Sequence, residues 1–121
     1  MLLAEDMEIN WEVANEILSS TGMQLEHAAD GRECLEMFEA SAPGYYDAVL
    51  MDIRMPGMDG YEAARAIRSL ERPDRGIPII AMTADAFAGD IQKCLDAGMD
   101  DHIAKPLDIG ECMRVLQNHL G

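Results

Sequence analysis

Short runs of apolar residues alternate along this chain with longer segments in which apolar residues have helical spacing. The clearest runs are Met1 to Ala4, Ala48 to Met51 and Ile77 to Met82. Each is too short for a helix and is largely apolar, which is typical of strands buried on both faces of a parallel sheet. Two weaker candidates are Met23 to Ala28, which alternates as an edge strand does, and Asp101 to Ala104. The pattern predicts a domain that repeats strand and helix.

The segments between the runs carry the residues that commonly begin helices. Asp30-Gly31, Asp59-Gly60, Asp85 and Asp108 stand where four helices are expected to start. In the first helical segment, an apolar face is expected from five residues: Ile9, Val13, Ala14, Ile17 and Leu18. Strict alternation of this kind predicts an α/β fold, a (βα)5 doubly wound five-stranded parallel sheet with helices on both faces and right-handed crossovers.

Length and charge narrow the function classes. At 121 residues and 13.3 kDa, the chain is expected to form one domain over residues 1–121. Lys and Arg together number 9 and Asp and Glu 23, which gives a net charge of −14. A surface this acidic repels phosphate backbones and anionic lipids, so nucleic acids and membrane surfaces are poor partners, whereas cations and basic surfaces are good ones.

The cysteines indicate the compartment. Cys34, Cys94 and Cys112 are odd in number and widely spaced, so they predict small buried side chains instead of a disulfide framework or a zinc site. No apolar stretch approaches the ~18 residues of a membrane span, and no signal-peptide pattern opens the chain. A reducing, cytoplasmic location is therefore expected.

Polar residues follow four of the predicted strands. Glu5 and Asp6 come after the first strand, Asp52 ends the third, Thr83 ends the fourth and Lys105 follows the fifth. In an open parallel sheet, ligands bind outside the carboxyl ends of the strands, so these residues are expected to converge. Clustered carboxylates repel each other unless a cation joins them, and Mg²⁺ suits such oxygen ligands. A carboxylate beside Mg²⁺ and a lysine can act as nucleophile toward a phosphoryl group.

Each of these residues has a simpler explanation when it is considered alone. Acidic residues and a threonine at strand ends often cap helices, and Lys105-Pro106 is compatible with a simple turn. Asp52 is less easily explained, because a carboxylate at a buried strand end needs a partner. It is their joint placement at the strand ends that favours a phosphoryl site.

Four segments carry a resemblance to a known family. They are LLAED at 2–6, MDIRMPGMDGYEAARAIR at 51–68, PIIAMTADAF at 78–87 and AGMDDHIAKPL at 97–107. The sequence resembles a response-regulator receiver domain of two-component phosphorelays. Its motifs are most similar to those of the receivers of hybrid sensor histidine kinases. The resemblance covers essentially the whole chain and implies the flavodoxin-like receiver fold.

The resemblance implies a metal site and a phosphoacceptor. Asp52 would be the phosphoacceptor, and Asp6 and Asp52 would bind Mg²⁺ directly. The main-chain carbonyl of Arg54 would be a further metal ligand, and Glu5 would assist through water.

Further roles follow from the same resemblance. Lys105 would pair with the phosphoryl oxygens, Thr83 would be the switch hydroxyl, and Ala84 would be the small residue beside the phosphate. Pro106 occupies the cis-proline position after the lysine. The aromatic switch position, three residues before the lysine, is His102 here.

The resemblance also implies partners and a role. The domain is expected to accept a phosphoryl group from a phosphohistidine onto Asp52 and thereby switch its signalling surface. Its partner would be a histidine kinase or a histidine phosphotransfer domain, with Trp11 on the docking surface, and a weak homodimer is left open. The domain alone would not be an enzyme, although it would catalyse its own phosphorylation and dephosphorylation. We expect it to be an excised module of a hybrid histidine kinase.

Three alternatives differ in what they require. A pseudo-receiver that no longer accepts phosphate would usually have lost an acidic ligand, the threonine or the lysine, and this chain keeps them all. A Mg²⁺-dependent phosphohydrolase of the haloacid-dehalogenase type needs a second Asp two positions after the nucleophile, where Arg54 stands. A flavodoxin-like cofactor binder needs a phosphate loop after the first strand, and Glu5-Asp6 would repel that phosphate.

Overall fold

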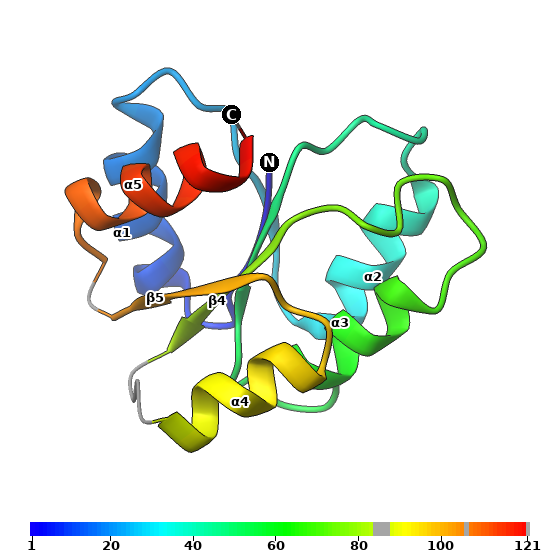
Figure 1. Ribbon diagram of the computed structural model, residues 1–121. Coiled ribbons are helices and arrows are strands. Elements are labelled where there is room, and N and C mark those ends of the chain that lie inside the picture. Colours follow the sequence, from blue (N-terminus) through cyan, green and yellow to red (C-terminus); the bar gives the residue numbers. More distant parts are fainter. Residues whose placement is uncertain (84–87, 106, 121) are drawn as a thin grey trace.

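The computed structural model describes residues 1–83, 88–105 and 107–120, and it confirms the alternation of strands and helices (Figure 1). The strands are β1 (Leu2–Ala4), β2 (Glu26–Ala28), β3 (Val49–Asp52), β4 (Ile79–Thr83) and β5 (Asp101–Ala104). The helices are α1 (Glu8–Ser19), α2 (Gly31–Ala40), α3 (Gly60–Arg68), α4 (Ala88–Asp96) and α5 (Ile109–Leu120).

The strands form one parallel sheet in the order β2-β1-β3-β4-β5, as the α/β interpretation predicts. Figure 1 shows α1 and α5 on one face of the sheet and α2, α3 and α4 on the other. Two apolar clusters fill these layers, one with Leu18 and Leu116 and the other with Phe38 and Ile67. The strand order reverses beside β1, so the loops that follow β1 and β3 meet at the edge where ligands bind in this architecture.

Helix α1 buries less of its apolar surface than the sequence pattern predicts. Ala14 and Leu18 are buried, whereas Ile9 and Val13 are 65% and 46% exposed. Ala14 and Leu18 are four residues apart and lie on one stripe of the helix. Ile9 and Val13 each stand one residue before a position of that stripe, so their side chains point about 100° away from it around the helix axis. The expected single face is therefore split into a buried stripe and an exposed one.

The start of α3 presses against the end of β3. Asp59 caps the helix, since its side chain accepts a hydrogen bond of 2.9 Å from the Glu62 N–H. A Cβ atom on Gly60 would lie 2.5 Å from the main-chain oxygen of Asp52 and 2.8 Å from the Cα of Ile53. Only glycine fits this close approach, which holds the start of α3 against the main chain of the predicted phosphoacceptor Asp52 and of Ile53 after it.

Replacing Gly60 with alanine should therefore destabilise the domain by about 1–3 kcal/mol, because backbone atoms cannot move aside as a flexible side chain can. Chemical denaturation measures the change. Gly76→Ala is the matched control, since nothing lies within 4 Å of the added Cβ there. Equal stability of the two variants would show that the helix start has room to shift.

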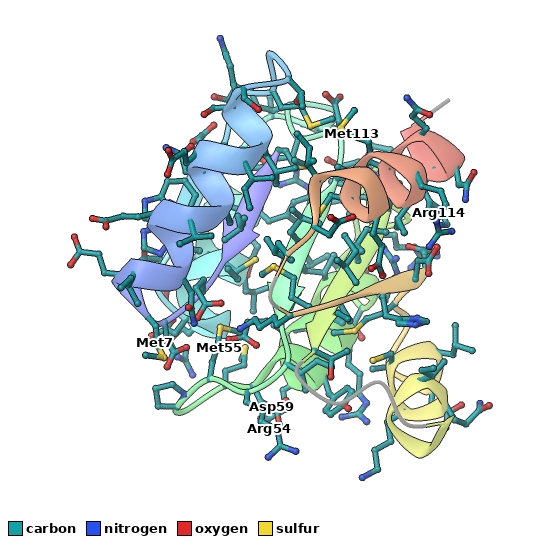
Figure 2. The ribbon with its side chains drawn as sticks, turned by 90° about the vertical axis from the view of Figure 1, so that its left-hand side faces the viewer. Met7, Arg54, Met55, Asp59, Met113 and Arg114 are labelled. Carbon is teal, nitrogen blue, oxygen red and sulfur yellow. The ribbon has the colours of Figure 1, made fainter. Side chains whose placement is uncertain are left out.

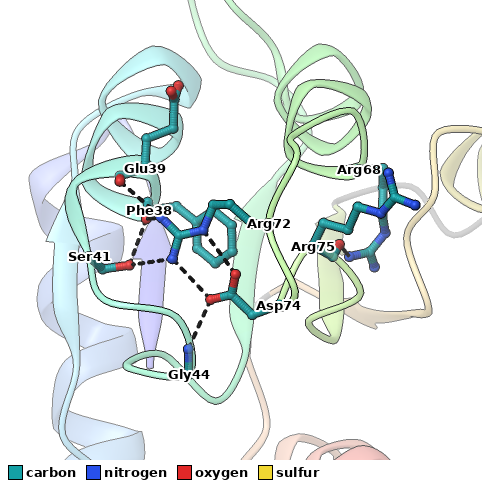
Figure 3. Close-up of polar contacts among 8 residues, drawn as sticks. All are labelled: Phe38, Glu39, Ser41, Gly44, Arg68, Arg72, Asp74 and Arg75. Carbon is teal, nitrogen blue, oxygen red and sulfur yellow. Dashed lines mark hydrogen bonds and ion pairs between the residues drawn. The ribbon is translucent and has the colours of Figure 1, made fainter.

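The opposite end of the sheet is held by Arg72 (Figure 3). Its Nη1 donates to the main-chain oxygens of Phe38 at 2.8 Å and Glu39 at 2.9 Å, and its guanidinium lies 4.6 Å from the centre of the Phe38 ring. Its Nε donates to Asp74 at 2.9 Å, and the same carboxylate accepts from the Gly44 N–H at 3.0 Å. These contacts tie the end of α2 to the connection before β4, away from the predicted site.

The three cysteines are free and buried, as predicted. Within the described ranges, no helix combines the length and the apolar character needed to cross a membrane.

Candidate functional site

Four of the five residues predicted at the strand ends come together around one pocket of about 210 Å³. Asp52 and Thr83 are the last residues of β3 and β4, and Asp6 and Lys105 follow β1 and β5. All four line the pocket. Because β1, β3, β4 and β5 are consecutive neighbours in the sheet, the sequence could predict this convergence.

Lys105 joins two carboxylates in this pocket. Its Nζ lies 2.9 Å from Oε2 of Glu5 and 3.0 Å from Oδ2 of Asp52. Glu5 is only 2% exposed, and Asp52 is buried as well. The ammonium thus supplies the positive charge that two buried carboxylates require.

Glu5 has further partners within its own loop and α1. Its Oε1 accepts from the Met7 N–H at 3.2 Å and from Nδ2 of Asn10 at 3.4 Å. Burial by itself raises the pKa of the Glu5 carboxyl, but the hydrogen bond and charge of Lys105, together with the hydrogen bonds from Met7 and Asn10, outweigh burial, so the pKa is lowered. Glu5 is therefore held as a carboxylate at the back of the site.

Asp52 shows the opposite balance. Burial raises the pKa of its carboxyl to about 6, against the hydrogen bond and charge of Lys105, and the charge of Glu5 adds to the rise. One lysine does not neutralise the site, and a further cation would favour the ionised form of Asp52. The carboxylate is the form that a nucleophile requires, so such a cation would favour the reactive form of Asp52.

The acidic residues fit a hard divalent cation. Glu5, Asp6 and Asp52 each offer a carboxylate oxygen, and these oxygens lie within 4.8 Å of one another. Asp6 is exposed while the other two are buried, so the set opens toward solvent. A site with a small number of carboxylates and one side open to solvent suits Mg²⁺, because this ion keeps several waters and binds a phosphate oxygen.

The other predicted residues have different outcomes. Arg54 lines the same pocket, and Figure 2 shows it at the end of the molecule where Met7, Met55 and Asp59 also lie. The roles assigned to the Arg54 carbonyl and to a water at Glu5 stay predictions. Ala84 and Pro106 lie outside the described residues.

His102 lies on β5 with its side chain 31% exposed. Its main-chain N–H donates to Oδ1 of Asp101 at 2.8 Å, and its ring Nδ1 is 3.7 Å from the same oxygen. The ring is thus neither buried nor fully in solvent. Its role as the switch aromatic stays a prediction.

If His102 is that switch, its ring should move inward when a phosphoryl mimic binds. We expect the imidazole carbon and proton NMR shifts of His102 to change on addition of beryllofluoride with Mg²⁺. An imidazole buries less apolar area than Tyr or Phe, so the inward state should be incompletely populated. Unchanged ring shifts, with a moving Thr83 amide as internal control, would remove His102 from the switch.

Two residues that contact Glu5, in the acidic pair Glu5-Asp6, were not identified as site residues from the sequence. Asn10 bonds the Glu5 carboxylate, and a ring nitrogen of His27 lies 2.8 Å from the Glu5 main-chain oxygen. His27 stands on β2, and a polar ring in a short strand beside β1 is the one sequence signal that could have indicated it.

Comparison with known proteins identifies the family of this domain. Residues 1–117 match the family described as the response regulator receiver domain. The chain belongs to that family. A similar solved structure is the receiver domain of sensor histidine kinase PA1611 from Pseudomonas aeruginosa, with magnesium coordinated in its active-site cleft. It is 44% identical, with a TM-score of 0.88, over 99% of this chain and 95% of that one.

Hybrid histidine kinases are among the curated relatives of this receiver domain. Hybrid signal transduction histidine kinase L of Dictyostelium discoideum is 35% identical over 98% of this chain, which spans 7% of that protein's length. A solved structure with the same fold is the Ssk1 receiver domain of Saccharomyces cerevisiae, crystallised with the histidine phosphotransfer protein Ypd1. It is 23% identical, with a TM-score of 0.85, over 98% of this chain and 86% of that one.

Proposed function

We propose that this receiver domain accepts a phosphoryl group from a phosphohistidine onto Asp52 in a Mg²⁺-dependent reaction. The observation that carries the proposal is the pocket in which Asp52, Asp6 and Lys105 converge, with Glu5 bonded to the lysine behind them. Magnesium in a receiver 44% identical to this one supports the choice of metal.

Each residue of the site has its own role in the proposed phosphoryl transfer. An oxygen of the Asp52 carboxylate forms the new bond to phosphorus as the bond from phosphorus to the donor histidine nitrogen breaks. That nitrogen keeps the bonding electron pair. Lys105 is within reach of Asp52 and can turn its charge from the carboxylates to the phosphoryl oxygens. Mg²⁺ at Glu5, Asp6 and Asp52 would neutralise phosphoryl charge, and Thr83, which lines the pocket, would contact the product.

Intact mass after incubation with phosphoramidate tests this function. One phosphoryl increment is expected with Mg²⁺ and none in excess chelator, because the metal-free pocket is too negative for an incoming phosphate. No increment in either condition would favour the pseudo-receiver. Steady release of phosphate from a phosphate monoester would favour the phosphohydrolase.

The partner we propose is a histidine phosphotransfer domain or a kinase of the hybrid type. Met7, Ile9 and Val13 on and before α1 are 54%, 65% and 46% exposed, an unusual display of large apolar side chains. A groove of about 350 Å³, which Val13 lines, also reaches Glu5 and Lys105. The crystallised pair of Ypd1 and the Ssk1 receiver supports this class of partner.

Ile9→Asp should slow transfer from a phosphotransfer domain by about tenfold, because a carboxylate would be buried in the interface. Labelling by phosphoramidate should be unchanged, since the small donor needs no docking surface. Leu95→Asp on α4 is the matched control, as Leu95 is also exposed, at 51%, but lies on the other face of the sheet. Equal transfer rates for the two variants would place docking elsewhere.

Two further parts of the proposal concern the catalytic activity of the domain and its location in the cell. The domain alone is a phosphoacceptor that catalyses its own phosphorylation and dephosphorylation, and turnover of an external substrate is not its activity. Its free, buried thiols support a reducing location, which we propose is the cytoplasm.

A further inference from the structure

A histidine outside the pocket holds the main chain at the acidic pair. His27 is the middle residue of β2 and is paired in register with Leu3 of β1. Its Nε2 lies 2.8 Å from the main-chain oxygen of Glu5. A carbonyl oxygen can only accept, so the contact requires a proton on Nε2 of His27.

The carbonyl in question belongs to the peptide that joins Glu5 to Asp6. The pairing of β1 with β2 ends at Ala4 and Ala28, and the last backbone bond runs from the Glu5 N–H to the Ala28 oxygen at 3.0 Å. Beyond that point the side chain of His27 takes the place of a strand partner. Because a peptide is planar, fixing this carbonyl also fixes the Asp6 N–H and the direction in which Asp6 leaves the plane.

The imidazole is itself held in place by Trp11. The two rings are stacked, with centroids 4.5 Å apart and planes 3° from parallel. Trp11 lies on α1 and is partly buried against the cluster that contains Leu18. The indole therefore restricts rotation of the imidazole and keeps Nε2 directed at the carbonyl.

We propose that His27, clamped by Trp11, is a positioning residue for divalent metal binding through the Glu5–Asp6 peptide. The inference rests on the proposed function, because it concerns the same metal site. His27 does not contact the metal or the phosphoryl group. It limits the orientations of two carboxylates that belong to adjacent residues, and this lowers the entropy lost when both engage one cation.

Two substitutions separate the hydrogen bond from the stack. His27→Phe keeps an aromatic ring against Trp11 but has no donor, whereas His27→Gln places an amide donor close to the position of Nε2. With Mg²⁺ alone as the titrant, calorimetry should show affinity about two- to tenfold weaker in His27→Phe, the value of one hydrogen bond. His27→Gln should recover most of the loss. His119→Gln on α5 is the matched control and should bind as the wild type does.

A measurement without metal addresses the mechanism directly. The Asp6 amide belongs to the peptide whose carbonyl accepts from His27, so its ¹⁵N shift should change in metal-free His27→Phe and return in His27→Gln. Trp11→Leu leaves β2 intact and should also weaken Mg²⁺ binding, since the imidazole is no longer clamped. Melting temperatures of the same samples show whether each variant is folded.

The outcomes are distinguishable. Wild-type affinity in both His27→Phe and Trp11→Leu would overturn the positioning role and leave the proposed function intact. Affinity that follows melting temperature across all variants, with no rescue by glutamine, would reduce His27 to a structural residue and overturn the inference. Failure of the wild type to bind Mg²⁺ would overturn the proposed function and this inference with it.

Discussion

Asp52→Asn should abolish the phosphoryl mass increment completely, the largest effect expected of any single substitution in this domain. An amide has the shape of the carboxylate but is not nucleophilic, and it cannot form the acyl phosphate. Intact mass after incubation with phosphoramidate and Mg²⁺ measures the loss.

The same variant should stay folded, so the loss cannot be attributed to unfolding. Burial raises the pKa of the Asp52 carboxyl, which means that its environment disfavours the charge that asparagine removes. Lys105 keeps Glu5 as a partner at 2.9 Å. Asp47→Asn, on an exposed residue before β3, is the matched control and should label normally. A full increment in Asp52→Asn would move the acceptor to another side chain.

The topology was predictable because its signals are local. Apolar runs such as Ala48 to Met51 cannot be helices of useful length, and parallel pairing follows from the helical segments between them. Once the strands are parallel, their carboxyl ends must share an edge, and Asp52, Thr83 and Lys105 were placed together on that ground alone. The helix starts at Gly31, Gly60 and Ile109 also follow the predicted Asp residues.

Partner choice within the site was not predictable. That Lys105 contacts both Glu5 and Asp52 does not follow from the spacing of these three residues along the chain, and its role toward the phosphoryl oxygens stays a prediction. Similarly, His27 contacts Glu5 only because the two strands pair with Leu3 opposite His27. Contacts of this kind depend on register and side-chain direction, which a periodic pattern does not contain.

The exposure of Ile9 and Val13 was also not predictable from the sequence pattern, and it bears on partner binding. Helical spacing identifies an apolar stripe, but not which part of it the sheet covers. Here Ile9 and Val13 lie about 100° around α1 from the buried residues Ala14 and Leu18, and Val13 lines the groove that reaches Glu5 and Lys105. A mismatch between apolar pattern and burial is expected at sites that bind partners.

Lys105→Ala should separate metal binding from phosphoryl transfer. Without the ammonium, Mg²⁺ should bind at least as tightly as in the wild type, because no cation competes for Glu5 and Asp52. Phosphorylation by phosphoramidate should nevertheless slow by about 100-fold, since one preorganised charge on the phosphoryl oxygens is lost. Calorimetry and the time course of the mass increment measure the two effects.

The unfolding free energy of Lys105→Ala should also depend on the balance of charge between Lys105, Glu5 and Asp52. Metal-free Lys105→Ala leaves Glu5 and Asp52 buried without their shared cation, which should cost about 2 kcal/mol of unfolding free energy. Mg²⁺ should restore more stability to this variant than it adds to the wild type, because it replaces the missing charge. Lys93→Ala on the exposed side of α4 removes the same charge elsewhere and should do none of this. Weaker Mg²⁺ binding with undiminished phosphorylation in Lys105→Ala would show that the lysine serves the metal site and not the phosphoryl group.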